Sequence, residues 1–384
     1  LGDVYKRQLM KSPFQYGTLV DKENFVNRVE ERKQLKELLG SGINVMLISP
    51  RRWGKSSLVK VAMDELMHED KQVRVCYIDA FSIKTESEFY RIFAREVIAC
   101  AASTLEKRLE DVRHFLKTVS PSITLKSTPT DTMSFDLKFE LEERDVMEIL
   151  KLPEKIAIAK SIRLIVCIDE FQQLAQLSGY RDLEGKMRSV WQKQQQVSYC
   201  FYGSKRHMML DIFNNSSNPF YRFGQVLFLQ KIKKEEWVPF IVNAFKRTNK
   251  EISKEQAEQL CDIVKCHSWY LQQLCYFVWS GTSDKVTDET IEMRTRQLID
   301  TNMPMFMNDT ENLTAAQTAM LRAVANGEYR FNSIPVVRKY ELGSAQTITR
   351  NKRMLTERDF IEKEGELYVF SDPVFELWFK REYC

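Results

Sequence analysis

The chain has 384 residues, of which 43% are hydrophobic and 29% charged, and its formal net charge is +4. This composition is that of an ordinary soluble globular protein, and the length indicates two or three domains. The charge is too small to argue for nucleic-acid binding, and no apolar run reaches membrane-helix length. The scattered cysteines predict reduced thiols, and the four lone histidines lack the spacing of metal ligands.

The start of the chain is unusual, because leucine comes first and the first methionine is Met10. We expect residues 1–9 to be an upstream extension outside the fold. No secretory pattern of charge, apolar stretch and cleavage site opens the chain. Together with the reduced thiols, this predicts a cytoplasmic protein with no membrane segment.

Strand and helix patterns alternate through the first half of the chain. Apolar runs predict buried strands over 43–49, 73–81, 163–171 and 197–204. Helical periodicity predicts helices over 23–39, 56–69, 86–117, 142–161 and 184–195. Strands that alternate with helices in this way predict a parallel sheet covered on both faces, with residues 10–232 as one α/β core.

The remaining segments differ in pattern. Residues 118–138 alternate polar and apolar side chains with period two, which predicts a β-hairpin insertion in the core. Residues 233–305 show only helical patterns and predict an all-α lid. Residues 306–384 predict three helices and a hairpin that turns at Gly365, which is the pattern of a winged helix.

The stretch "LISPRRWGKSSLV" has the order strand, tight turn, Gly-Lys-Ser, helix, which is typical of a phosphate-binding loop. Gly54 allows the backbone to approach phosphate oxygens, Lys55 reaches the β- and γ-phosphates, and Ser56 holds Mg²⁺. The loop departs from the usual motif at Ser49, where glycine normally stands.

The stretch "LIVCIDE" predicts a buried strand that ends in Asp169 and Glu170. We expect this strand beside the phosphate-loop strand, with Asp169 holding Mg²⁺ and Glu170 polarising the attacking water as general base. Alone, the pair is equally a strand that ends in two solvated carboxylates. Its occurrence together with the Gly-Lys-Ser turn favours a nucleotide site.

These stretches, with "FVNRVEERKQL", "YGSK" and "NPFYRFG", resemble the AAA+ P-loop ATPases of the archaeal-type family, relatives of STAND and origin-recognition initiator ATPases. The resemblance runs from about Met10 to the C-terminus. It implies a P-loop parallel αβα sandwich, an all-α lid and a C-terminal winged helix, with ATP and Mg²⁺ as ligands. In that family Pro-Arg-Arg often precedes the Gly-Lys-Ser/Thr, and serine is tolerated at the first glycine position.

The resemblance also implies roles for single residues. Phe25 and Arg28 match a box that lies against adenine, although a helix cap with a surface arginine is the alternative. Ser204 matches a polar residue that orients the lytic water. Arg222 matches an arginine finger for the γ-phosphate, or else it is a structural arginine. The phosphate-loop residues implied to bind nucleotide are Ser49, Pro50, Arg51, Arg52, Trp53, Gly54, Lys55, Ser56 and Ser57.

The lid segment "CHSWYLQQLC" departs from the family pattern, because Cys266 and Trp269 replace a glycine and a proline. We therefore expect Trp269, Tyr270 and Leu274 to be lid core rather than nucleotide sensors.

In the winged helix, Ser344 is expected to cap a helix whose exposed side carries Arg350, Lys352 and Arg353. Such a face binds duplex DNA in recognition helices. The hairpin is acidic, however, and contact with a protein partner or with the rest of the chain is the alternative.

The sequence therefore predicts a slow ATPase that hydrolyses ATP with Mg²⁺ as a nucleotide-dependent switch coupled to the winged helix. Two alternatives stay open: a DNA-binding ATPase or regulator, and a non-hydrolysing, nucleotide-dependent signalling scaffold. A nucleotide-dependent homo-oligomer is compatible with each of these functions.

Overall fold

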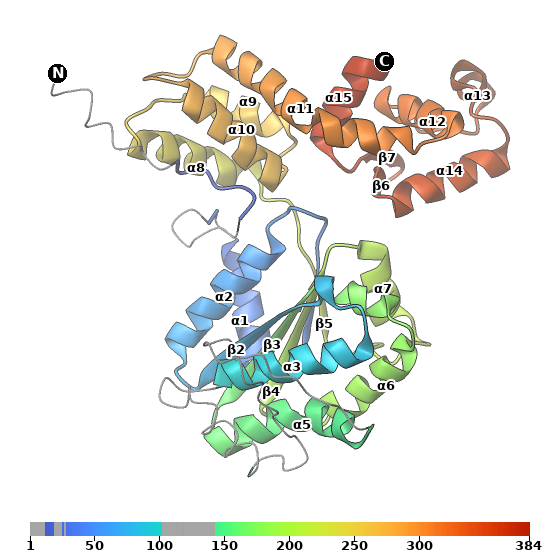
Figure 1. The fold of residues 1–384 in the computed structure, drawn as a ribbon. Coiled ribbons are helices and arrows are strands. Elements are labelled where there is room, and N and C mark those ends of the chain that lie inside the picture. The colour runs from blue at the N-terminus through green and yellow to red at the C-terminus, as the bar shows by residue number, and fades with distance from the viewer. Residues whose placement is uncertain (1–11, 19–24, 27, 102–117, 119–142) are drawn as a thin grey trace, which may run out of the picture. The chain divides into compact units, whose positions relative to one another are not determined.

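The structure is a computed structural model that describes residues 12–18, 25–26, 28–101, 118 and 143–384. The chain forms two compact units (Figure 1). The first is Arg28–Gln230, and the second combines Leu1–Asn27 with Lys231–Cys384.

The first unit is built on a parallel sheet of five strands in the order β2-β3-β4-β1-β5. The strands are β1 (Val45–Ile48), β2 (Val73–Asp79), β3 (Arg163–Asp169), β4 (Val197–Gly203) and β5 (Gln225–Phe228). Four of them were predicted. The fifth was not, because its four residues are only half-buried or exposed and carry no long apolar run.

The strand order corrects one expectation from the sequence. We expected the strand ending in Asp169 to lie beside the phosphate-loop strand, but β4 lies between them and pairs with both. All seven residues of β4 are buried, as a central strand covered on both faces requires. The end of β4 therefore lies between the ends of β3 and β1.

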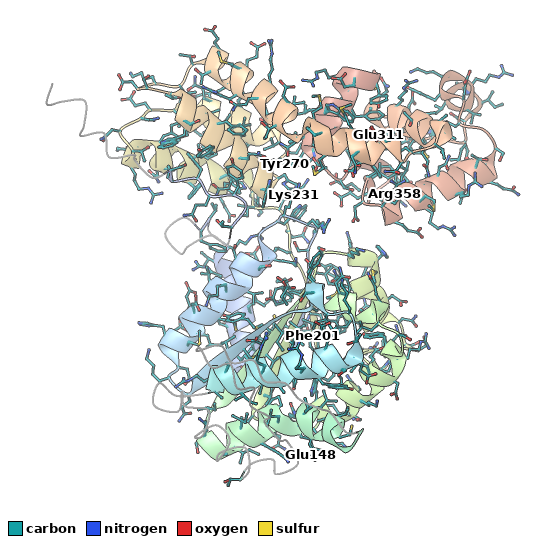
Figure 2. The ribbon with its side chains drawn as sticks, in the orientation of Figure 1. Glu148, Phe201, Lys231, Tyr270, Glu311 and Arg358 are labelled. Carbon is teal, nitrogen blue, oxygen red and sulfur yellow. The ribbon has the colours of Figure 1, made fainter. Side chains whose placement is uncertain are left out.

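Helices cover both faces of this sheet (Figure 1). They are α1 (Val29–Gly40), α2 (Lys55–Glu69), α3 (Glu86–Ala101), α5 (Glu143–Lys160), α6 (Tyr180–Trp191) and α7 (Arg206–Asn214). Alternate strand residues such as Met46 and Ile168 share one apolar core with α3 and α5. Phe201 of β4 lies inside this core (Figure 2). The predicted αβα sandwich is confirmed.

Some sequence expectations fall outside the described residues. The helix predicted over 86–117 is present as α3 as far as Ala101, and 102–117 are not described. The predicted β-hairpin over 118–138 is likewise outside them except for Thr118, and so are residues 1–9.

The second unit is mostly helical. Its elements are α8 (Lys234–Arg247), α9 (Lys254–Ile263), α10 (Ser268–Gly281), α11 (Asp288–Glu311), α12 (Ala315–Ala325), α13 (Ile334–Tyr340), α14 (Ala345–Glu357), β6 (Ile361–Glu364), β7 (Leu367–Phe370) and α15 (Pro373–Tyr383). Tyr270 and Leu274 are fully buried in its core and Trp269 is partly buried. Within the part of the chain that the structure describes, no helix is long and apolar enough to cross a membrane.

The last part of this unit has the order expected of a winged helix. The helices α12, α13 and α14 precede the antiparallel hairpin β6–β7, which turns at Gly365 with a φ of 61°. The Ser344 hydroxyl accepts the Thr347 N–H and so caps α14, as predicted. The helix α11 runs without a break through positions 305 and 306, where the sequence suggested a boundary between lid and winged helix.

Candidate nucleotide site

The loop between β1 and α2 has the backbone of a phosphate cradle. Gly54 stands just before α2 with a φ of 84°, and Arg52 also adopts a left-handed conformation. Glycine reaches this region without strain, which explains its place at Gly54. The N-cap residue of α2 is Gly54, which has no side chain that could cap the helix. The first amide groups of a helix lack intrahelical acceptors, so this N-terminus is suited to bind an anion.

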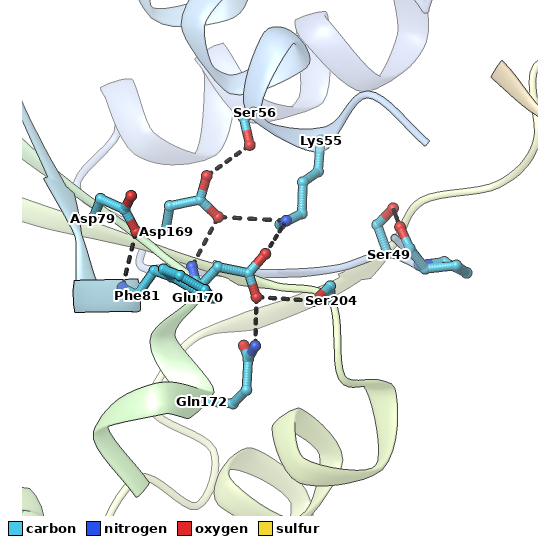
Figure 3. Close-up of polar contacts among 10 residues, drawn as sticks. Ser49, Lys55, Ser56, Asp79, Phe81, Asp169, Glu170, Gln172 and Ser204 are labelled. Carbon is cyan, nitrogen blue, oxygen red and sulfur yellow. Dashed lines mark hydrogen bonds and ion pairs between the residues drawn. The ribbon is translucent and has the colours of Figure 1, made fainter. Parts of the chain in front are cut away.

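Ser49 fits the loop without strain at its backbone. It is fully buried, and it is not among the residues with positive φ. Its N–H donates to the Gly203 carbonyl at 3.3 Å, and its hydroxyl donates to the Pro50 carbonyl at 2.9 Å (Figure 3). A Cβ at this position is therefore compatible with the loop, although glycine is usual there.

The start of α2 and the end of β3 bring four polar side chains together (Figure 3). Lys55 Nζ lies 2.6 Å from Glu170 Oε1 and 3.4 Å from Asp169 Oδ1. Ser56 donates its hydroxyl proton to Asp169 Oδ2 at 2.6 Å. The two segments that sequence analysis singled out thus form one cluster.

The backbone at Glu170 turns sharply, with a φ of 48°, and leads into the 3₁₀ helix Phe171–Gln176. Phe171 packs on the ring of Phe201 in β4 with ring centroids 4.3 Å apart, which anchors this turn on the sheet. Ser204, directly after β4, donates its hydroxyl proton to Glu170 Oε2 at 2.9 Å. The intervening strand β4 therefore supplies a contact to the acid at the end of β3.

Gln172 also belongs to this cluster, and no role was predicted for it. Its side-chain amide donates to the same oxygen, Glu170 Oε2. It stands two positions after the stretch "LIVCIDE", but a glutamine just after a strand end reads as a surface residue. Only the fold shows that it is fully buried.

The two carboxyl groups differ in their tendency to ionise. Burial raises the pKa of Asp169 above its ordinary value, although Lys55 and Ser56 favour the ionised form. Burial also acts to raise the pKa of Glu170, but the charge of Lys55 and the hydrogen bonds to this carboxylate outweigh it and lower the pKa. Glu170 is therefore held in its ionised form, as a base requires.

Arg28 is buried, not on the surface as the helix-cap alternative assumed; only 2% of its side chain is exposed. It occupies the N-cap position of α1, and its guanidinium donates to the carbonyls of Trp53 and Gln230 and to Glu31. It thus fixes the phosphate loop to the start of α1. Phe25 is half-buried and belongs to the second unit.

Arg222 is not part of this cluster. It is exposed and lies three residues before β5, whose first residue, Gln225, pairs with Val45 at the start of β1. The phosphate loop follows the opposite end of β1, so the length of that strand, about 10 Å, lies between them. Arg51 and Arg52 are exposed on the loop, whereas Ser57 is buried in α2.

Comparison with known proteins identifies two family matches along the chain. Residues 25–274 match the model of a family described as "ATPase domain predominantly from Archaea", and residues 304–381 match that of a probable winged helix domain. None of the curated proteins searched matches the chain.

Among solved structures, a Walker-type ATPase of Pyrococcus abyssi is similar over 96% of this chain and 99% of that one, with a TM-score of 0.70 and 18% identity. The ORC2 protein of Aeropyrum pernix, solved as ADPNP–ADP complexes, is similar over 96% of this chain and 99% of that one, with a TM-score of 0.60 and 14% identity. At these identities the likeness concerns the fold. Because the family match spans more than half of the sequence, the chain belongs to the family of ATPase domains found predominantly in Archaea.

Proposed function

We propose that the chain binds ATP with Mg²⁺ at the N-terminus of α2 and hydrolyses it slowly, as a nucleotide-dependent switch coupled to the winged helix. The observation that carries this proposal is the meeting of Lys55, Ser56, Asp169 and Glu170 at the carboxyl end of the sheet. The family is one of ATPase domains, which supports the same reading.

Phosphate binding is assigned to the loop. Gly54 and the first amides of α2 receive phosphate oxygens, and Lys55 turns from Glu170 to the β- and γ-phosphates. Mg²⁺ usually takes one or two protein oxygens and completes its shell with phosphates and water, and the Ser56 hydroxyl with the Asp169 carboxylate fits that donor set. When bound, the ion would neutralise charge that develops on the phosphates.

Hydrolysis is assigned to Glu170. Its Oε2 accepts a hydrogen bond from the Ser204 hydroxyl, whereas its Oε1 accepts one from Lys55 Nζ. Once Lys55 engages phosphate, Oε1 is the atom that accepts a proton from the attacking water. Ser204 keeps the carboxylate oriented at the strand end.

Arg222 is assigned to a neighbouring copy of the chain. An arginine finger must reach the γ-phosphate, and the strand register puts Arg222 at the other end of β1. A second copy would bring it to the site, and this assignment implies ATP-dependent homo-oligomers.

The test is ATP turnover by the full chain with and without duplex DNA, with the low residual turnover of Glu170→Gln as the baseline. Glu37→Gln, at an exposed residue of α1, is the matched control and should equal wild type. Turnover above the baseline supports the proposal. If wild type and Glu170→Gln bind ATP but are equally inert, hydrolysis is wrong and the non-hydrolysing scaffold replaces it.

DNA binding through the winged helix is the second candidate, because Arg350 and Arg353 are both exposed on α14 while Lys352 is partly buried. Against it, Arg353 lies 3.7 Å from Glu357, and Glu364 and Glu366 are exposed beside Gly365. Salt-sensitive duplex binding that weakens on replacing both arginines with alanine would support it. Oligomerisation on ATP with no DNA effect would favour a protein partner.

A further inference from the structure

Gln172 is a polar residue that is buried among apolar side chains. It is fully buried at the start of the 3₁₀ helix Phe171–Gln176, next to Phe171. Its Nε2 donates to Glu170 Oε2, and its Oε1 has no hydrogen-bond partner among the residues that the structure describes. The reverse orientation would set the amide oxygen against a carboxylate oxygen, so the contact with Glu170 fixes which atom donates.

The unpartnered oxygen of Gln172 lies against the backbone of Gly203. Gln172 Oε1 occupies the space beside Gly203, where a Cβ would come within 2.0 Å of it. Gly203 is the last residue of β4 and precedes Ser204. Because only glycine leaves room there, Gln172 is wedged between the end of β4 and Glu170.

Leaving a buried amide oxygen unpaired is unfavourable, because the oxygen loses its hydrogen bonds to water without gaining another. An apolar side chain would fill the same space without that cost. What the glutamine adds is a charge-assisted hydrogen bond to Glu170, and such bonds are about twice as strong as neutral ones. The donor is therefore what distinguishes Gln172 from an apolar side chain of similar size.

We infer that Gln172 is a positioning residue: with Ser204 it holds Oε2 of Glu170, so that Oε1 faces the attacking water. This inference rests on the proposed hydrolysis. Gln172 touches neither phosphate nor metal in this assignment, and it acts only through the carboxylate of Glu170. It therefore affects the rate of the chemical step rather than nucleotide affinity.

The test replaces Gln172 by methionine, which has similar length and no amide donor. The matched control is Gln176→Met, the same change at an exposed position of the same 3₁₀ helix. We expect Gln172→Met to lower kcat for ATP about tenfold, the lower end of the loss seen when outer-shell partners are removed from metal sites. Nucleotide Kd should change less than twofold, and Gln176→Met should equal wild type.

The discriminating readout is the same substitution in a Glu170→Gln background. A residue that acts through Glu170 causes no further loss there, whereas a residue that only supports folding lowers residual activity in both backgrounds. Loss of equal size in both backgrounds, or an unchanged kcat in Gln172→Met protein, overturns the inference. If wild type itself does not exceed Glu170→Gln, the proposed hydrolysis fails and this role fails with it.

A second variant guards against misfolding, because Gln172 is buried. Gly203→Ala keeps the glutamine but displaces it, and Gly185→Ala, with open space around its Cβ position in α6, is the control. Gly203→Ala should lower kcat in the wild-type background. In the Glu170→Gln background the same substitution should cause no further loss. Thermal unfolding of each variant shows whether the fold is retained, and a wild-type kcat in folded Gly203→Ala protein also contradicts the inference.

Discussion

Lys55 and Glu170 are 115 positions apart in the sequence, and their side chains form an ion pair of 2.6 Å. The same ammonium group lies 3.4 Å from Asp169. One cation therefore serves two adjacent carboxylates that are each about one-fifth exposed. Folding thus brings Lys55, the proposed phosphate-binding cation, into direct contact with Glu170, the proposed base. Lys55 therefore affects both phosphate binding and the charge of the base.

Removing this cation should weaken nucleotide binding. We expect Lys55→Met to reduce ATP affinity about tenfold or more, which corresponds to about 1.4 kcal/mol. Lys60→Met is the matched control, because Lys60 is exposed on the same helix and pairs with Asp64. Titration with a fluorescent ATP analogue measures both. Equal affinities for wild type and Lys55→Met would refute the assignment of the phosphate site.

Arg28 should matter for stability as well as for binding. Arg28→Ala removes a buried guanidinium that donates to the Trp53 and Gln230 carbonyls and leaves Glu31 without this partner. Loss of a buried charged partner typically costs about 3–5 kcal/mol, and we expect the lower end because the side chain of Glu31 is 36% exposed. Arg51→Ala, at an exposed loop position, should change stability little. Urea unfolding measures the difference, and equal midpoints would contradict it.

The pH dependence of stability should reveal Glu184, which is buried on α6 and accepts the Phe220 N–H at 3.1 Å. Burial raises its pKa from 4.5 to about 7, a direction that Asp211 reinforces and that the Phe220 N–H and Arg181 oppose. A carboxyl whose pKa is raised on folding stabilises the fold below its unfolded pKa. That contribution is lost as pH rises through the folded pKa.

Glu184→Gln keeps an acceptor for Phe220 and cannot ionise. It should match wild type near pH 4 and be more stable at pH 8, by on the order of 2–3 kcal/mol. Chemical unfolding at both pH values tests this expectation. A difference between the variants that does not grow from pH 4 to pH 8 would show that Glu184 is not the titrating group.

Variants that lack Arg222 and variants that lack Glu170 should restore each other's activity when two copies of the chain assemble. Arg222→Ala and Glu170→Gln should each lower turnover at least about tenfold, since arginine fingers contribute more than that in other ATPases and GTPases. A mixture of the two variants should regain activity, because one copy supplies the finger and the other the base. Arg181→Ala, exposed on α6, serves as control. A mixture that stays inactive, or full activity of Arg222→Ala alone, would rule out a finger from a neighbour.

Local sequence patterns were enough to predict the single residues of the candidate nucleotide site. Gly54, Lys55 and Ser56 stand at a strand-to-helix turn, and Asp169 with Glu170 ends a buried strand, so their positions follow from short stretches of sequence. The structure brings these segments together, as predicted. Contacts between them need only that two parallel strands end at the same edge of a sheet.

Strand order and burial could not be predicted in the same way. The position of β4 between β3 and β1 depends on the path of the helical crossovers, which no short stretch encodes. The short edge strand β5 was missed, and with it the register that sets Arg222 at the far end of the sheet. The burial of Arg28 and Gln172 depends on what covers them, which the sequence does not show. Arg28 was expected against adenine, with a surface position as the alternative, and no role was predicted for Gln172.

The end of β4 links the two halves of the site through the backbone. The Gly203 carbonyl accepts the N–H of Ser49 at the entry of the phosphate loop, and the next residue, Ser204, donates to Glu170. A single peptide unit thus connects the loop's entry to the proposed base. A displacement of the loop would reach the carboxylate through these two hydrogen bonds and the peptide unit between them, so we expect phosphate occupancy and the orientation of Glu170 to be coupled.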